Sequence, residues 1–178
     1  GVHMSYLVAE TQNPFTDEIY GIAKRHGKTV DEVNAFLMRK SVRPGHIVRD
    51  DLSAFGAVGH LLVGESTERL VVAALNPAHR LIAVEVLTTG SDAYTVVCPR
   101  QVFRWALAQG EAGAKAIVMA HNHPSGNPLP SVQDYAVTQR VAEAGEVIGI
   151  TLLDHLVVAR GGAYSSIRNL RSSLFGGA

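Results

Sequence analysis

The sequence is poor in cysteine and has no excess of either charge. Cys98 is the only cysteine in 178 residues, which excludes an internal disulfide. Its place just before an expected helix favours a packed small residue over a ligand or a nucleophile. Sixteen Lys and Arg balance sixteen Asp and Glu, and no basic stripe is present. This balance argues against the strong, non-specific phosphate binding expected of a DNA-binding module.

Long apolar runs are also missing. No segment approaches the roughly 20 residues of a transmembrane helix, and the first residues lack the basic and apolar parts of a signal peptide. We therefore expect no membrane association and a reducing, cytoplasmic location. Residues 1–4 (GVHM) are typical of a cleavage scar ahead of a native start at Met4, so His3 is not a candidate functional residue.

Residues 5–48 are expected to form a helical N-terminal extension. Two short helices are predicted, at 16–25 and 29–40, and the second opens with a capping box from Thr29 to Glu32. The two helices have the spacing of a helix-turn-helix motif, with a glycine in the turn. Most short helical hairpins pack as scaffolding, however, and the balanced charge does not favour DNA recognition here.

Residues 49–170 are expected to form one α/β domain with a mixed sheet, because the chain is long enough for one well-buried core and too short for two large ones. The expected elements are a helix from Asp50 toward Val63, strands at 70–75 and 81–87, a helix at 99–109, a strand at 115–120, a helix ending at Ala144, and a strand at 150–158. Phe103, Trp105 and Leu107 are expected in the core. Residues 171–178 are expected to be a flexible tail.

The most informative segment joins the strand at 115–120 to the helix that follows it. It has the form H-x-H-P-x(6)-S-x(2)-D, with His121, His123, Ser131 and Asp134 as its polar members. The two histidines are two apart on an extended segment, so their side chains point the same way. Ser131 and Asp134 have capping-box spacing, which places Asp134 in the first turn of the helix, where a carboxylate is favoured. Three prolines stiffen the loop at 124–130 and reduce the entropy lost on fixing it around an ion.

Two imidazoles and one carboxylate are the ligand set of a catalytic zinc site, in which the fourth position stays open for water. Such a site also needs a general base near the water and a donor for the oxyanion. Ser131 is a candidate donor, although a role as helix cap alone also explains it. A single histidine is more often a surface or core residue, but the spaced set favours one zinc ion per chain.

The segment 121–134 (HNHPSGNPLPSVQD) resembles the signature of the JAMM (MPN-plus) metallopeptidases. Its HNHPSG form, together with the later Asp154-His155, is similar to the RadC-like bacterial branch. The resemblance extends from about Glu65 to Ser166. It implies a JAB/MPN fold of the cytidine-deaminase-like kind, in which helices flank a curved mixed sheet. It also implies a set of roles: zinc ligation by His121, His123 and Asp134, oxyanion stabilisation by Ser131, and action of an upstream glutamate on the zinc-bound water.

Two glutamates are candidates for that base. Glu68 directly precedes an apolar strand, as the family's glutamate does, and is the favoured candidate. Glu85 is the alternative, but it alternates with Val84 and Val86 and so fits a solvent-facing strand position. Glu65 is a minor rival.

Asp154 and His155 interrupt an otherwise apolar strand. A buried polar pair is costly unless its members bond to each other or to a site. One interpretation is that one of them supports a zinc ligand from behind, because metal-bound imidazoles usually donate their other nitrogen to an acceptor. The other is a structural hydrogen-bonded pair at a sheet edge. The strand pattern does not decide between them.

The sequence therefore predicts a zinc-dependent hydrolase. Its resemblance implies cleavage of peptide or isopeptide bonds, as by a deubiquitinase, in a protein or peptide substrate that carries a ubiquitin-like modifier. One alternative is a DNA-processing nuclease or repair-associated protein, which the RadC-like resemblance allows but the charge balance does not support. Another is a non-catalytic scaffold, against which the complete ligand set counts. A homo-oligomer is compatible with the sequence.

Overall fold

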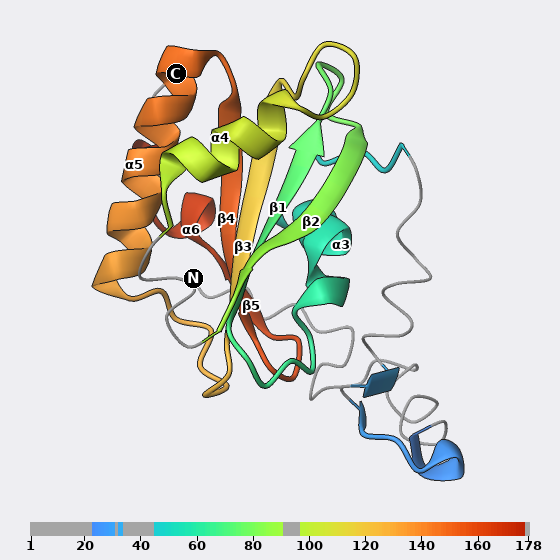
Figure 1. Ribbon diagram of the computed structural model, residues 1–178. Helices are drawn as coiled ribbons and strands as arrows, with labels where there is room; N and C mark the ends of the chain where they lie inside the picture. The colour runs from blue at the N-terminus through green and yellow to red at the C-terminus, as the bar shows by residue number, and fades with distance from the viewer. Residues whose placement is uncertain (1–22, 31, 34–44, 91–96, 177–178) are drawn as a thin grey trace.

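The computed structural model describes residues 23–30, 32–33, 45–90 and 97–176, and all structural statements concern these residues. Its strands form one five-stranded sheet in the order β2-β1-β3-β4-β5 (Figure 1). In chain order the elements are α3 (Asp51–Val58), the 3-10 helix η1 (Gly59–Leu61), β1 (Arg69–Leu75), β2 (Leu81–Thr89), α4 (Pro99–Leu107), β3 (Ala116–His123), α5 (Val132–Ile148), β4 (Thr151–Ala159), β5 (Tyr164–Ser166), α6 (Ile167–Leu170) and the 3-10 helix η2 (Ser172–Phe175).

The sheet is mixed, as the sequence predicts. β1 runs antiparallel to both β2 and β3, β3 runs parallel to β4, and β5 returns antiparallel to β4. β3 lies in the middle, and every residue from Ala116 to Asn122 is buried. A strand covered on both faces carries a continuous apolar run instead of an alternating one, which explains the sequence KAIVMA.

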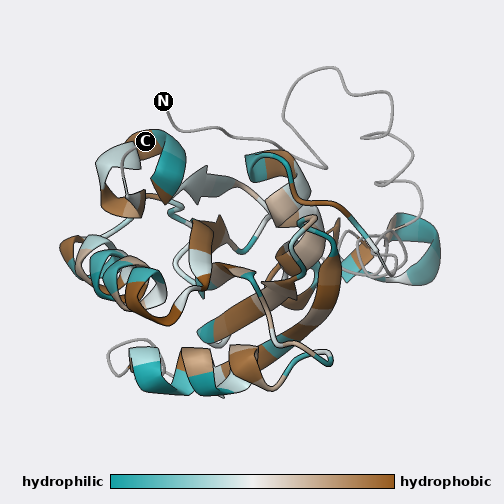
Figure 2. Ribbon diagram, turned by 90° about the horizontal axis from the view of Figure 1, so that it is seen from above, coloured by the Kyte–Doolittle hydropathy of each residue, from teal (hydrophilic) through white to brown (hydrophobic). Residues whose placement is uncertain are grey.

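Helices cover both faces of the sheet. α4 and α5 pack on one face and α3 on the other, with the apolar strands between them (Figure 2). Alternate residues of β1 divide between the two cores: Leu70 and Val72 join the core under α4 and α5, whereas Val71 and Ala73 join the core under α3. The α/β prediction with a mixed sheet flanked by helices is confirmed.

The predicted end of α5 at Ala144 is wrong. The helix continues through Gly145 and ends at Ile148, followed by Gly149, whose φ of 83° forms a left-handed cap. Gly145 serves close packing instead: a Cβ built there would lie 2.3 Å from the carbonyl oxygen of Ile150 and 3.2 Å from the ring of Phe103. Only a residue without a side chain lets the helix approach β4 this closely.

Three other expectations near the helices need correction. Leu107 is 56% exposed because it ends α4 on the solvent side, whereas Phe103 is buried and Trp105 only partly so. α4 ends at Leu107, two residues before the expected end. Cys98 precedes α4 as expected but is exposed, so it is not a packed core residue.

The flexible tail expected at 171–178 is also wrong as far as residue 176. η2 brings Phe175 to 8% exposure in the core under α4 and α5. The guanidinium of Arg168 lies 5.7 Å from the centre of the Phe175 ring, and that of Arg171 lies 4.2 Å from the centre of the Tyr135 ring on α5. The chain after β5 is therefore tied to the domain.

Most of the N-terminal extension lies outside the described residues, including most of both predicted helices. Its capping box is confirmed, since Thr29 N donates to Glu32 Oε2 at 2.8 Å and Glu32 N donates to Thr29 Oγ1 at 3.1 Å. Within the described part of the chain, no helix has the length and apolar character needed to cross a membrane.

Candidate metal centre

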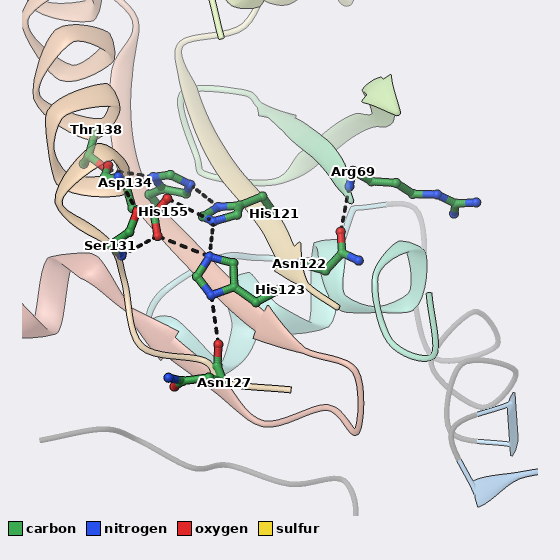
Figure 3. Close-up of polar contacts among 9 residues, drawn as sticks. All are labelled: Arg69, His121, Asn122, His123, Asn127, Ser131, Asp134, Thr138 and His155. Carbon is green, nitrogen blue, oxygen red and sulfur yellow. Dashed lines mark hydrogen bonds and ion pairs between the residues drawn. The ribbon is translucent and has the colours of Figure 1, made fainter. Parts of the chain in front are cut away.

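Three predicted ligands meet where β3 ends and α5 begins (Figure 3). Asp134 Oδ1 lies 3.3 Å from His121 Nε2, and Asp134 Oδ2 lies 3.3 Å from His123 Nε2. The two Nε2 atoms are 3.1 Å apart. All three ligand atoms thus fall within 4.8 Å of one another, a spacing that could hold a metal ion.

Local structure fixes each of the three side chains. β3 extends to His123, three residues beyond the predicted strand end, so both histidines alternate as strand residues onto one face. Asp134 is held by the capping box of α5, in which its Oδ2 accepts from Ser131 N at 2.6 Å and its own N donates to Ser131 Oγ at 3.1 Å. A rigid strand and a capped helix turn therefore supply the ligands.

The cluster keeps its carboxylate ionised. Burial by itself raises the pKa of Asp134, but its contacts with the two imidazoles of His121 and His123 outweigh burial and hold that pKa well below its usual range. Burial lowers the pKa of His121, whose side chain is fully covered. Asp134 raises the pKa of His123, whose side chain is 20% exposed. The site presents a buried negative charge beside two imidazoles.

The tautomer of His123 follows from its outer contact. Its Nδ1 lies 2.8 Å from the backbone carbonyl oxygen of Asn127. A carbonyl oxygen only accepts, so Nδ1 carries the proton. In the neutral ring this leaves a lone pair on Nε2, the atom that faces Asp134 and His121.

Asp154 and His155 lie on opposite faces of β4. His155 is buried beneath α5, with its Nε2 2.9 Å from His121 Nδ1 and its Nδ1 2.7 Å from Thr138 Oγ1. Asp154 faces away from the metal centre and accepts from Ser166 Oγ at 2.6 Å and from Arg168 N at 3.1 Å. The structure therefore brings one member of the pair to the cluster and uses the other to hold α6.

Among the three candidate glutamates, the metal centre influences Glu68. Partial burial raises the pKa of Glu68, while the charge of His123 lowers it and that of Asp134 raises it. Its carboxyl therefore lies within electrostatic range of the cluster. Glu85 is exposed on β2 and accepts a hydrogen bond from Trp105 Nε1, and Glu65 pairs with Arg69 at 2.9 Å.

Asn122, the residue between the two histidines, holds the segment that carries Glu68. Its side chain points to the other face of β3, where Oδ1 accepts from Arg69 N at 2.7 Å (Figure 3). Its Nδ2 donates to the carbonyl of Thr67 at 2.9 Å and, at 3.4 Å, to that of Glu65. Sequence reasoning treated this position as a spacer. A polar residue inside a strand that is otherwise buried was the available signal.

Comparison with known proteins agrees with this geometry. The family described as the RadC-like JAB domain matches residues 49–172, which include every strand and all three ligands. The chain belongs to the RadC-like JAB domain family. This membership suggests a relation to the JAMM-type metallohydrolases, and the convergent His-His-Asp cluster is compatible with it.

The RadC-like JAB domain is similar to several curated relatives. A UPF0758 protein of Cyanothece sp. is 38% identical over 127 residues, which cover 71% of this chain and 49% of the relative. One from Symbiobacterium thermophilum is 46% identical over 103 residues, covering 58% of this chain and 42% of the relative. One from Methanospirillum hungatei is 43% identical over 109 residues, covering 61% and 47%. The chain thus spans about half the length of the relatives it matches.

Proposed function

We propose that this RadC-like JAB domain is a zinc-dependent hydrolase that binds one ion per chain through His121, His123 and Asp134. One observation carries the proposal: the Nε2 atoms of both histidines and a carboxylate oxygen of Asp134 converge within 4.8 Å at a largely buried point. Ring nitrogens and a carboxylate at these distances repel one another unless a proton or a metal cation lies between them. An imidazole and carboxylate ligand set of three suits zinc with an open position.

A bound zinc ion would acidify a water molecule and polarise the carbonyl of a substrate. Glu68 would accept a proton from the attacking water and deliver it to the leaving amine. Its position just before β1 and its raised pKa support this role, because a base titrating closer to neutral pH transfers protons in both directions more effectively. Glu85 does not suit the role, because it is exposed and bonded to Trp105.

Ser131 would stabilise the oxyanion that develops on the substrate carbonyl. Its Oγ accepts a hydrogen bond from Asp134 N, so the capping contact uses a lone pair and leaves the hydroxyl proton available to donate. The cap and the donor roles are therefore compatible in one side chain.

We infer that the bond cleaved is a peptide or isopeptide, in a protein or peptide that carries a ubiquitin-like modifier. The resemblance of segment 121–134 to the JAMM signature supports this substrate class, and the balanced charge does not favour a phosphodiester. The cytoplasm is the proposed location.

The proposal is tested with purified protein, a modifier-fused peptide, an isopeptide-linked conjugate and a labelled single-stranded DNA, each with and without chelator. We expect zinc at one ion per chain and chelator-sensitive cleavage of a peptide substrate. His123→Ala should lose the metal. Glu68→Gln should keep the metal and lose activity, and Glu85→Gln is the matched control that keeps both. Cleavage of DNA alone would replace a peptidase by a nuclease, and stoichiometric zinc without any cleavage would favour a scaffold.

A further inference from the structure

We propose that Thr138, acting through His155, fixes the tautomer of His121 so that its Nε2 presents a lone pair to the ion. Both are positioning residues, since neither reaches the three ligand atoms that surround the ion. The proposal rests on the proposed zinc centre, but it makes a statement about protons that is measurable without any metal.

The contacts form a chain that starts on α5 and ends at a ligand. Thr138 lies one helical turn after Asp134, and its Oγ1 is 2.7 Å from the carbonyl oxygen of Asp134. The same Oγ1 is 2.7 Å from His155 Nδ1, and His155 Nε2 is 2.9 Å from His121 Nδ1 (Figure 3). Thr138, His155 and His121 are all fully buried.

The number of available protons determines the direction of each hydrogen bond in this series of contacts. A threonine hydroxyl has one proton, and the carbonyl of Asp134 only accepts, so the hydroxyl donates there. Thr138 Oγ1 must then accept at its other contact, which places a proton on His155 Nδ1. A neutral imidazole carries only one proton, so His155 Nε2 is an acceptor, and His121 Nδ1 donates to it.

As a consequence, Nε2 of His121 carries no proton. With its proton on Nδ1, His121 has a lone pair on Nε2, which lies 3.1 Å from His123 Nε2 and can accept a proton from that ring until an ion takes its place. If the Thr138 hydroxyl pointed at His155 instead, every proton would move by one position, and His121 Nε2 would carry a hydrogen where the ion should lie. His123 reaches the same state through one direct contact with a backbone carbonyl, whereas His121 depends on a relay of two side chains.

Asp154 has no part in this relay. It accepts from the backbone N of His155 at 2.7 Å, but its carboxyl lies on the face of β4 opposite the imidazole of His155. Of the two residues that the sequence singled out here, only His155 connects to the cluster.

The test is a nitrogen NMR measurement of histidine tautomers in metal-free protein, paired with zinc affinity from chelator competition. In the wild type we expect the His121 proton on Nδ1. Thr138→Val keeps the shape but removes the acceptor, so His155 should shift its proton to Nε2 and His121 should follow. Zinc affinity should then fall about 10- to 100-fold, the usual loss on removing such a partner. Thr138→Ser, which keeps the hydroxyl group, should have the wild-type tautomer of His121 and the wild-type zinc affinity.

A second pair of variants isolates His155. His155→Gln places an amide oxygen within reach of His121 Nδ1 and should retain much of the affinity, whereas His155→Leu should not. The relay is overturned if wild-type His121 carries its proton on Nε2, or if Thr138→Val leaves both tautomer and affinity unchanged. Absence of zinc binding in the wild type, with the expected tautomers present, would instead overturn the proposed function alone.

Discussion

The two faces of β3 and β4 both carry buried polar side chains, yet only one face forms the candidate metal centre. Beneath α5 lie His121 and His155, next to Asp134 of α5 itself, and on the opposite face lie Asn122 and Asp154. Asn122 and Asp154 are satisfied by backbone groups and one serine hydroxyl. Under α5, two ring nitrogens and a carboxylate oxygen converge on a common point. Burial of polar side chains alone does not mark a site; the direction of their protons does.

The largest effect is expected from a change at Glu68, which belongs neither to the His-His-Asp cluster nor to the contacts of Asn122 and Asp154. Glu68→Gln removes the proposed base and should lower kcat about a hundredfold to ten-thousandfold with zinc content unchanged. Steady-state kinetics and metal analysis measure the two quantities. Glu85→Gln should keep wild-type kcat, and equal losses in both variants would reject the assignment.

Removing the ion should affect only the face beneath α5. A ligand at a thousand times its dissociation constant stabilises a protein by about 4 kcal/mol, so excess chelator should lower the free energy of unfolding by roughly this amount. Denaturant unfolding with and without chelator measures the difference. His123→Ala should show no response to chelator, and a response equal to that of the wild type would contradict the assigned ligand set.

On the face opposite α5, a substitution should lower the free energy of unfolding before it lowers zinc affinity. Asn122→Ala leaves the backbone N of Arg69 and the carbonyl of Thr67 without their partner, which should cost about 2 to 4 kcal/mol. Because this side chain holds the segment that carries Glu68, kcat should also fall while zinc affinity stays near that of the wild type. Loss of zinc affinity with stability unchanged would place Asn122 in the metal centre instead.

Asp154 should give the smallest effect, visible as a dependence on pH. Burial raises its pKa from the usual 3.8 to about 6, so the folded protein holds this proton more tightly than the unfolded chain. The resulting stability is fully present below pH 3.8 and is lost as the pH rises through about 6, a change of roughly 2 to 3 kcal/mol.

Denaturant unfolding of the wild type and Asp154→Asn between pH 4 and pH 7 measures this contribution. The difference in unfolding free energy between the two proteins should change across that range, and zinc affinity should be the same in both. A pH-independent difference would show that the carboxyl titrates normally.

The three ligands were predictable because each lies in a local pattern. Spacing by two in a strand and a capping box in a helix are fixed by the sequence around His121, His123 and Asp134. Of the residues behind His121, the sequence offered His155 as one of two possible supports together with Asp154, and it gave no sign of Thr138. Thr138 and His155 meet only because β4 pairs with β3 and α5 docks over both, and no spacing in the sequence records that contact.

The errors in the fold have similar causes. β5 and α6 have three and four residues, too few for a hydrophobic period to be recognised. Gly145 was taken for a helix end because glycine usually has that role, whereas here it is required by the close approach of the Ile150 carbonyl at the helix end and of the Phe103 ring on α4. Local rules gave the α/β class and most strands, and tertiary packing decided the remaining boundaries.

The carboxylate of Asp134 serves two purposes: it completes the capping box by accepting from Ser131 N through Oδ2, and it is a proposed ligand. Departure of the ion and fraying of the first turn of α5 are therefore linked events. Amide hydrogen exchange at the start of this 17-residue helix should slow when the ion binds, while the same measurement near Gly149 should not change. The exchange rate of these backbone amides would then report whether an ion is bound, without the need for a substrate.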